Sequence, residues 1–130
     1  MDWTRGTARV FKTAWFSRAA RKSFLTDDEL CSAIRQVKLG QVDDLGGGVF
    51  KKRLGKNRYR SIIIAKSGRF WVYEYLFAKQ DRDNISDEEL TGFRKLAAGY
   101  SALVEEQVGQ LLRNGKWVEI CHDTAATIQE

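Results

Sequence analysis

The sequence has few of the residues on which most metal sites and acid–base catalysts depend. Its single histidine, His122, lies next to a small, polar C-terminal segment, residues 123–130. One histidine excludes a ribonuclease mechanism built on a histidine pair and a zinc site of ordinary composition. The chain also lacks Gly-x-Ser-x-Gly, Walker, EF-hand and dinucleotide-binding motifs. We therefore expect neither a metal nor a cofactor.

Long hydrophobic runs are also missing. None approaches the roughly 20 apolar residues of a membrane-spanning helix, and residues 1–5 are not followed by an apolar segment that would serve as a secretory signal. Cys31 and Cys121 do not form a Cys-x-x-Cys pair, and we interpret them as incidental thiols in a reducing compartment. The length predicts one domain, residues 1–130, with a core over about 9–120. Together with the missing signal segment, the thiols predict a cytoplasmic protein.

Acidic residues are absent between Lys51 and Arg69, a stretch that contains eight lysines and arginines. The net charge of the whole chain is only +5, so this stretch concentrates positive charge. Because side chains alternate between the faces of a strand, Lys51 and Arg53 are expected to share a face. Arg58 and Arg60 are expected to do the same. Fixed cations on a sheet suit a polyanion, above all nucleic acid, and the alternative is a solvated face that only aids solubility.

The N-terminal third predicts a strand and two helices. Residues 9–14 alternate loosely as in a strand, and residues 15–22 follow a short helical pattern. Thr26 and Glu29 have the spacing of a capping box, and apolar residues at helical spacing follow them. This second helix is expected to end at Gly40.

The central part predicts a loop followed by three strands. Residues 42–48 are expected to form the loop, whose glycines make a tight turn near the sheet; a phosphate-binding loop would lead into a helix. Strands are predicted at about 49–54, 58–65 and 69–79, joined by hairpins. The last strand is apolar on both sides, which indicates a central strand. Alternation assigns its residues to two faces: Phe70, Val72 and Leu76 to one, and Trp71, Tyr73, Tyr75 and Phe77 to the other.

A second capping-box pattern, at Ser86 and Glu89, begins the helical C-terminal part. Gly99 is expected to break this helix, Ser101 to cap another, and residues 116–120 to add a short strand. The predicted fold class is α+β, an antiparallel sheet of about four strands with two N-terminal helices and C-terminal helical segments.

The available chemistry rests on lysine, arginine and tyrosine. The acidic clusters at 27–29 and 87–89 lie in first turns of helices, where they complement the helix dipole, so a magnesium nuclease is not favoured. Cations can still promote RNA cleavage, because the nucleophile is the RNA's own 2′-hydroxyl and electrostatic stabilisation is usually the largest catalytic contribution.

Four short motifs resemble the RelE-like branch of the RelE/ParE/HigB superfamily of bacterial toxins. The similarity extends over about residues 9–120. In chain order the motifs are Phe11-Lys12-Thr13-x-Trp15-Phe16, Leu45 to Val49, Tyr59-Arg60, and Phe77-Ala78-Lys79 with Asn84-Ile85.

The resemblance implies a ribosome-associated mRNA endonuclease that a cognate antitoxin holds inactive. Lys51 and Arg53 match the basic pair that contacts and activates the RNA. Arg60 matches the arginine that stabilises the scissile phosphate, and Lys79 and Arg82 lie where the family keeps basic residues after the last strand. RNA contacts are also predicted for Lys52, Lys56, Arg58 and Arg69.

Two positions depart from the family pattern. Gln80 lies where RelE has an arginine that serves as general acid, and Ser86 lies where RelE has a catalytic tyrosine. Either Lys79 or Arg82 takes over the acid or charge-stabilising role, or this branch cleaves RNA poorly or differently.

The resemblance also implies partners: mRNA, the ribosome and an antitoxin with a helix-turn-helix fold of the HigA/Xre type. Promoter DNA would be bound only through the antitoxin complex, and no membrane partner is expected. Three hypotheses therefore remain open: an mRNA-cleaving toxin, a non-catalytic basic module such as a ParE-like gyrase poison, and a structural protein with no nucleic-acid role. Fold alone does not decide between them.

Overall fold

The computed structural model describes residues 8–66 and 69–122. Our expectations for the N-terminal segment 1–5 and the tail 123–130 fall outside these residues. The predicted α+β class is confirmed. The elements are β1 (Arg9–Thr13), α1 (Ala14–Lys22), α2 (Asp27–Lys38), β2 (Asp43–Gly46), β3 (Val49–Leu54), β4 (Tyr59–Lys66), β5 (Phe70–Ala78), α3 (Asp87–Ser101), α4 (Glu105–Arg113) and β6 (Trp117–Ile120).

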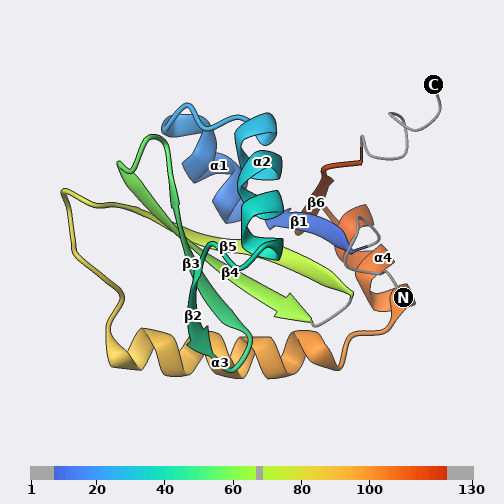
Figure 1. The fold of residues 1–130 in the computed structure, drawn as a ribbon. Coiled ribbons are helices and arrows are strands. Elements are labelled where there is room, and N and C mark those ends of the chain that lie inside the picture. The colour runs from blue at the N-terminus through green and yellow to red at the C-terminus, as the bar shows by residue number, and fades with distance from the viewer. Residues whose placement is uncertain (1–7, 67–68, 123–130) are drawn as a thin grey trace.

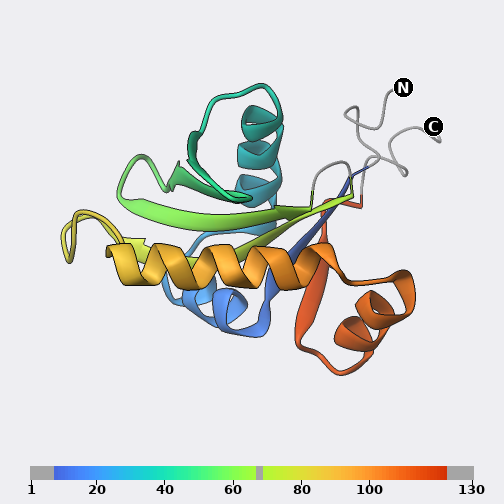
Figure 2. The same ribbon diagram turned by 90° about the horizontal axis from the view of Figure 1, so that it is seen from below.

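One sheet lies between two helical layers (Figure 1). Helices α1 and α2 pack on one face, α3 runs across the opposite face, and α4 lies beside β6 (Figure 2). The α1/α2 face buries Val10, Phe16, Leu30, Ile34, Ile63 and Tyr73, whereas the α3 face buries Val49, Ile62, Ile64, Phe77 and Ala97. Strands β3 to β5 are thus covered on both faces, as the apolar pattern of β5 predicts.

The sheet has six strands in the order β2-β3-β4-β5-β1-β6, and it is mixed. The expectation of about four antiparallel strands is wrong in two respects. First, β1 enters beside β5 and runs parallel to it, and β6 then pairs antiparallel with β1. Second, the predicted loop contains β2, in which Asp43 lies opposite Lys51. Aspartate is uncommon in strands, but the opposite charges of Asp43 and Lys51 across the two strands stabilise their pairing.

The two predicted capping boxes, at Thr26 and at Ser86, are both present. The predicted boundary between the two C-terminal helices is wrong. Helix α3 continues through Gly99 to Ser101, and Val104, not Ser101, occupies the N-cap of α4. A glycine inside a helix costs only about 1 kcal/mol relative to alanine. Packing of α3 against the sheet through Ala97 and its apolar neighbours offsets that cost.

A β-bulge in β5 changes which side chains face α3. The β4–β5 register shifts so that Glu74 is an extra residue of β5. Leu76 consequently packs in the α1/α2 cluster, and Tyr75 and Phe77 pack in the α3 cluster. Strict alternation placed Leu76 on the face of Phe70 and Val72. It placed Tyr75 and Phe77 on the face of Trp71 and Tyr73, and both assignments are wrong because they ignore the bulge.

The glycine turn between β2 and β3 behaves as predicted. Gly48 has φ +86°, and a Cβ at this position would lie 3.2 Å from the carbonyl oxygen of Ala65 and 3.2 Å from the Cβ of Ala97 in α3. Only a glycine allows this approach without displacing α3. The turn therefore brings β2 and β3 close beneath the helix.

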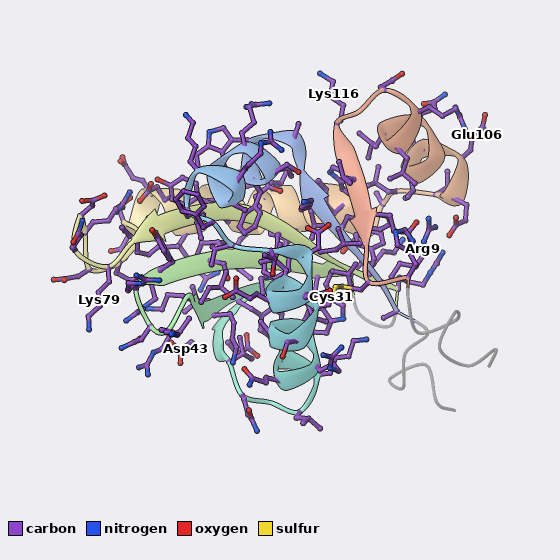
Figure 3. All side chains as sticks on the ribbon, turned by 90° about the horizontal axis from the view of Figure 1, so that it is seen from above. Arg9, Cys31, Asp43, Lys79, Glu106 and Lys116 are labelled. Carbon is purple, nitrogen blue, oxygen red and sulfur yellow. A yellow bond between two sulfur atoms is a disulfide. The ribbon has the colours of Figure 1, made fainter. Side chains whose placement is uncertain are left out.

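The two cysteines are joined, which corrects their interpretation as incidental thiols. Cys31 in α2 and Cys121 after β6 form a disulfide with a Cα–Cα distance of 5.5 Å (Figure 3). Their separation of 90 residues hid this pairing, because only the insertion of β1 between β5 and β6 brings them together. The inference of a reducing compartment rested on free thiols and loses that support. No helix of the described residues is long and apolar enough to span a bilayer.

Candidate functional site

Three cations of the basic stretch lie together on the α3 face of the sheet. Arg53 of β3 pairs directly with Arg60 of β4, so the two side chains project from the same face. Lys51 lies two residues before Arg53 on that face. We call Lys51, Arg53 and Arg60 the basic end.

The basic end lies beyond the part of the sheet that α3 buries. Farther along the same two strands, Val49, Ile62 and Ile64 are fully buried in the α3 cluster. Arg53 is exposed and Arg60 is half-buried. The sequence change from apolar to basic residues along β3 and β4 therefore marks the point where the sheet emerges from beneath α3.

The partners of these three cations differ. Lys51 Nζ donates to Asn84 Oδ1 at 3.2 Å and lies 4.0 Å from Asp43 Oδ2. Among the residues that the structure describes, Arg60 donates only to backbone carbonyls, those of Asn57 and Tyr59. Within the described residues neither Arg53 nor Arg60 forms an ion pair, so their charge is not balanced by a carboxylate.

Arg82 is held rigidly near this surface. Its guanidinium contacts the Glu89 carboxylate through two nitrogens, donates to the Asn84 carbonyl, and lies 5.4 Å from the centre of the Phe77 ring. The hydrogen bond from Arg82, followed by those from Ser86, lowers the pKa of Glu89 to about 2. The same pairing raises the pKa of Arg82, which makes it a fixed cation and a poor proton donor.

Lys79 lies at the exposed end of β5 beside a second group of cations. Its backbone N–H donates to the carbonyl of Arg58 at 2.9 Å. Lys56, Arg58 and Lys79 line one hollow of about 630 Å³. Arg58 belongs to the turn between β3 and β4 and not to the strand, so its expected alignment with Arg60 along a strand is wrong.

Two predicted RNA-binding residues lie apart from the basic end. Lys52 points to the α1/α2 face and donates to the Gln41 carbonyl; burial, followed by the charge of Arg53, lowers the pKa of Lys52. Arg69 precedes β5 at its opposite end and pairs with Glu105 at 3.2 Å. Arg60 lies opposite Phe77, eight residues along β5, or about 25 Å from Arg69 by strand geometry.

The two departures from the RelE pattern have different structural outcomes. Gln80 is exposed in the segment after β5. Ser86 is occupied as the N-cap of α3, where its hydroxyl accepts the Glu89 N–H at 3.1 Å. Ser86 therefore supports the helix that in turn orients Arg82.

Sequence reasoning missed three neighbours of the site: Asn84 as a partner of Lys51, Glu89 as the anchor of Arg82, and Tyr75. The Tyr75 hydroxyl lies 3.5 Å from Arg82 Nη1. No alternation rule places Tyr75 there, since the bulge at Glu74 turns it toward α3. The position of Glu89 could have been predicted, because the glutamate of a capping box has its carboxylate beside the N-terminus of the helix.

The chemistry of the arrangement is that of an anion site. Three cations on a rigid sheet and a fourth anchored beside them can bind and polarise a phosphodiester. Among residues 8–66 and 69–122, no cluster of three histidine, cysteine, aspartate or glutamate side chains could hold a metal ion.

Comparison with known proteins identifies the family. The family model described as "RelE toxin of RelE / RelB toxin-antitoxin system" matches residues 8–120. No curated protein and no solved structure matches the chain significantly. The matched range includes every element from β1 to β6 and all of the cations described above. The chain therefore belongs to the RelE toxin family of toxin–antitoxin systems.

Proposed function

We propose that the protein is a metal-independent endoribonuclease that cleaves mRNA at the basic end. The observation that carries this proposal is the cross-strand pair of Arg53 and Arg60, which no carboxylate of the described residues neutralises. Two adjacent arginines of like charge destabilise a sheet unless an anion lies between them. A phosphate of the substrate supplies that anion.

The proposed reaction needs no metal or cofactor, because solvent water accepts the proton of the 2′-hydroxyl. The 2′-oxygen attacks the adjacent phosphorus, the bond to the 5′-oxygen breaks, and a 2′,3′-cyclic phosphate and a 5′-hydroxyl form. Arg53 and Arg60 neutralise the charge that develops on the non-bridging oxygens. Lys51 lies two residues away and orients the ribose side of the phosphodiester.

The leaving 5′-oxygen requires a proton. Arg82 is disfavoured as the donor because its pairing with Glu89 raises its pKa. We assign this proton to Lys79, whose ammonium is exposed at the end of β5, and we assign to Arg82 the stabilisation of charge. Lys79→Arg should then lower the cleavage rate more than RNA affinity, whereas Arg82→Lys should lower both.

The direct test is induced expression followed by mapping of transcript 5′ ends. New ends within coding regions, dependent on Arg60, are expected. A gyrase poison would instead produce DNA breaks with intact transcripts, and a structural protein would produce neither. Repeating the reaction on purified RNA with and without ribosomes tests whether cleavage depends on the ribosome.

Membership of the family implies an antitoxin partner. We propose a helix-turn-helix protein whose acidic or amphipathic segment covers part of the cationic surface, and whose DNA-binding part brings the complex to its promoter. Co-expression with the neighbouring gene should restore growth and yield a complex. If growth is not restored and nothing co-purifies, this partner assignment is wrong.

A further inference from the structure

A separate cleft of about 640 Å³ lies where α1 meets an unpaired edge of β5. Strand β1 pairs with β5 only as far as Tyr73, and the chain then turns into α1, which packs beside the remaining residues of β5 (Figure 1). The cleft is lined by Trp15, Arg18 and Lys22 from α1 and by Tyr75 from β5. Trp15, Arg18 and Lys22 have no role in the cleavage chemistry proposed above, and Tyr75 is linked to it only through its hydroxyl, 3.5 Å from Arg82 Nη1.

Trp15 forms an exposed aromatic surface in this cleft. Its indole stacks on the Tyr75 ring with a centroid distance of 5.1 Å and an interplanar angle of 25°. Trp15 nevertheless remains 44% exposed, although tryptophan is on average a largely buried residue. Tyr75 holds the indole in place, and the exposed part of the indole is available to a planar ligand.

The charge of the cleft is positive. Arg18 and Lys22 are four residues apart on α1 and so project from the same side of the helix. Neither forms an ion pair with another described residue. Arg82, paired with Glu89, also lines the cleft, and so does one carboxylate, that of Asp81. Through Arg82 the cleft adjoins the surface that carries the basic end.

We propose that this cleft binds one nucleotide of single-stranded RNA outside the cleaved phosphodiester. The base stacks on Trp15, and Arg18 and Lys22 contact the flanking phosphate. Stacking on an aromatic ring combined with backbone cations is the usual way to hold unpaired RNA without base specificity. The inference rests on the proposed function and adds to it a second contact that sets the direction of the strand across the enzyme.

The aromatic contact is tested with a 2′-O-methyl oligonucleotide, which has no free 2′-hydroxyl and cannot be cleaved by the proposed reaction. Trp15→Ala should weaken its binding about 5- to 150-fold, the range for removal of one stacking platform. Trp15→Phe retains a ring and should recover most of the affinity. Phe24→Ala is the matched control, because Phe24 is 87% exposed and lies outside the cleft. It should bind as the wild type does.

The phosphate contact is tested by charge-matched variants on the same helix. Arg18→Gln and Lys22→Gln should each reduce the steepness of the salt dependence by up to about 0.7 in log affinity against log salt. Arg21→Gln removes the same charge from an exposed residue of α1 that does not line the cleft, and it should leave the slope unchanged. These exposed substitutions keep the test valid if Trp15→Ala perturbs folding.

The outcomes separate this inference from the proposed function. If Lys51→Ala and Arg60→Ala weaken RNA binding but the Trp15 and α1 variants do not, the nucleotide cleft is refuted and the cleavage site stands. If the wild type binds no RNA, both proposals fall. If Trp15→Ala binds RNA normally but no longer binds the antitoxin, the cleft is a protein-docking site and the inference is overturned.

Discussion

The two ends of the sheet carry similar arginines in opposite electrostatic settings. At one end, Arg9 contacts Glu119 through two nitrogens at 2.9 and 2.8 Å, and both Arg9 and Arg69 reach Glu105. We call these four residues the paired end, and the disulfide of Cys121 lies two residues beyond Glu119. At the other end, Arg53 and Arg60 have no carboxylate partner among the described residues. Figure 3 places the labelled Arg9 and Lys79 on opposite sides of the molecule.

The difference shows that basic composition alone does not define a binding surface. The arginines of the paired end are already satisfied, and an RNA phosphate there would have to compete with a carboxylate. The arginines of the basic end repel each other until an anion arrives. The ion pairs of the paired end stabilise the fold, and the unpaired arginines of the basic end provide the positive charge that the proposed activity uses.

The largest expected effect is on catalysis. Arg60→Ala should lower the RNA cleavage rate about 10²- to 10³-fold, the usual reduction when a group that stabilises transition-state charge is removed. Arg69→Ala, at the paired end, should leave the rate unchanged. Single-turnover cleavage of a defined RNA measures both. Equal reductions in the two variants would show that the two ends do not differ in function.

The disulfide should matter for stability and not for cleavage. Replacing Cys31 and Cys121 together by serine should reduce the free energy of unfolding by about 2–4 kcal/mol, since the bond closes a long loop. Urea unfolding of the oxidised protein and the double variant gives the comparison. Activity of the folded double variant should match the wild type, and a loss of cleavage would link the paired end to catalysis.

The sequence predicts the elements that depend on local pattern and not those that depend on contacts between distant segments. Strands β3 to β5, both capping boxes and the shared face of Lys51 and Arg53 follow from alternation, turn residues and spacing. The parallel β1–β5 pairing and the disulfide depend on interactions between distant segments, which local pattern does not encode.

The site was predictable only where a strand positions it. Lys51, Arg53 and Arg60 are brought together as expected, whereas Arg69 is separated from them and balanced by Glu105. Tyr75 could not be placed, because a single bulge residue, Glu74, reverses the alternation that follows it.

A smaller effect is expected from breaking the ion pair of the paired end. Arg9→Ala should lower the free energy of unfolding by about 1 kcal/mol, because the side chains of Arg9 and Glu119 are 37% and 24% exposed and solvent weakens the pair. Arg53→Ala should change it by less than about 0.5 kcal/mol, as for other exposed residues without partners. Urea denaturation at neutral pH measures the free energy of unfolding of both variants. A larger decrease for Arg53→Ala than for Arg9→Ala would contradict a structural role for the paired end and a binding role for the basic end.

The smallest effect concerns pH. The hydrogen bond from Arg9 lowers the pKa of Glu119, so the stabilisation is present above the ordinary glutamate pKa of about 4.3 and is lost as pH falls through the lower, folded-state value. Glu119→Gln should therefore be less stable than the wild type at pH 7, by about 0.5 kcal/mol. The difference should shrink below about pH 4. Glu106→Gln, an exposed control in α4 with no ion pair in the described region, should show no such convergence.

The salt dependence of RNA affinity tests the central contrast most directly. The double variant Arg53→Gln/Arg60→Gln removes two unpaired cations, and Arg9→Gln/Arg69→Gln removes the same charge from the paired end. With a 2′-O-methyl single strand, the first should flatten the plot of log affinity against log salt by about 1.4, or about 0.7 for each phosphate that is no longer neutralised. The second should leave the slope of the wild type unchanged. An unchanged slope in the first variant, or equal flattening in both, would contradict the account.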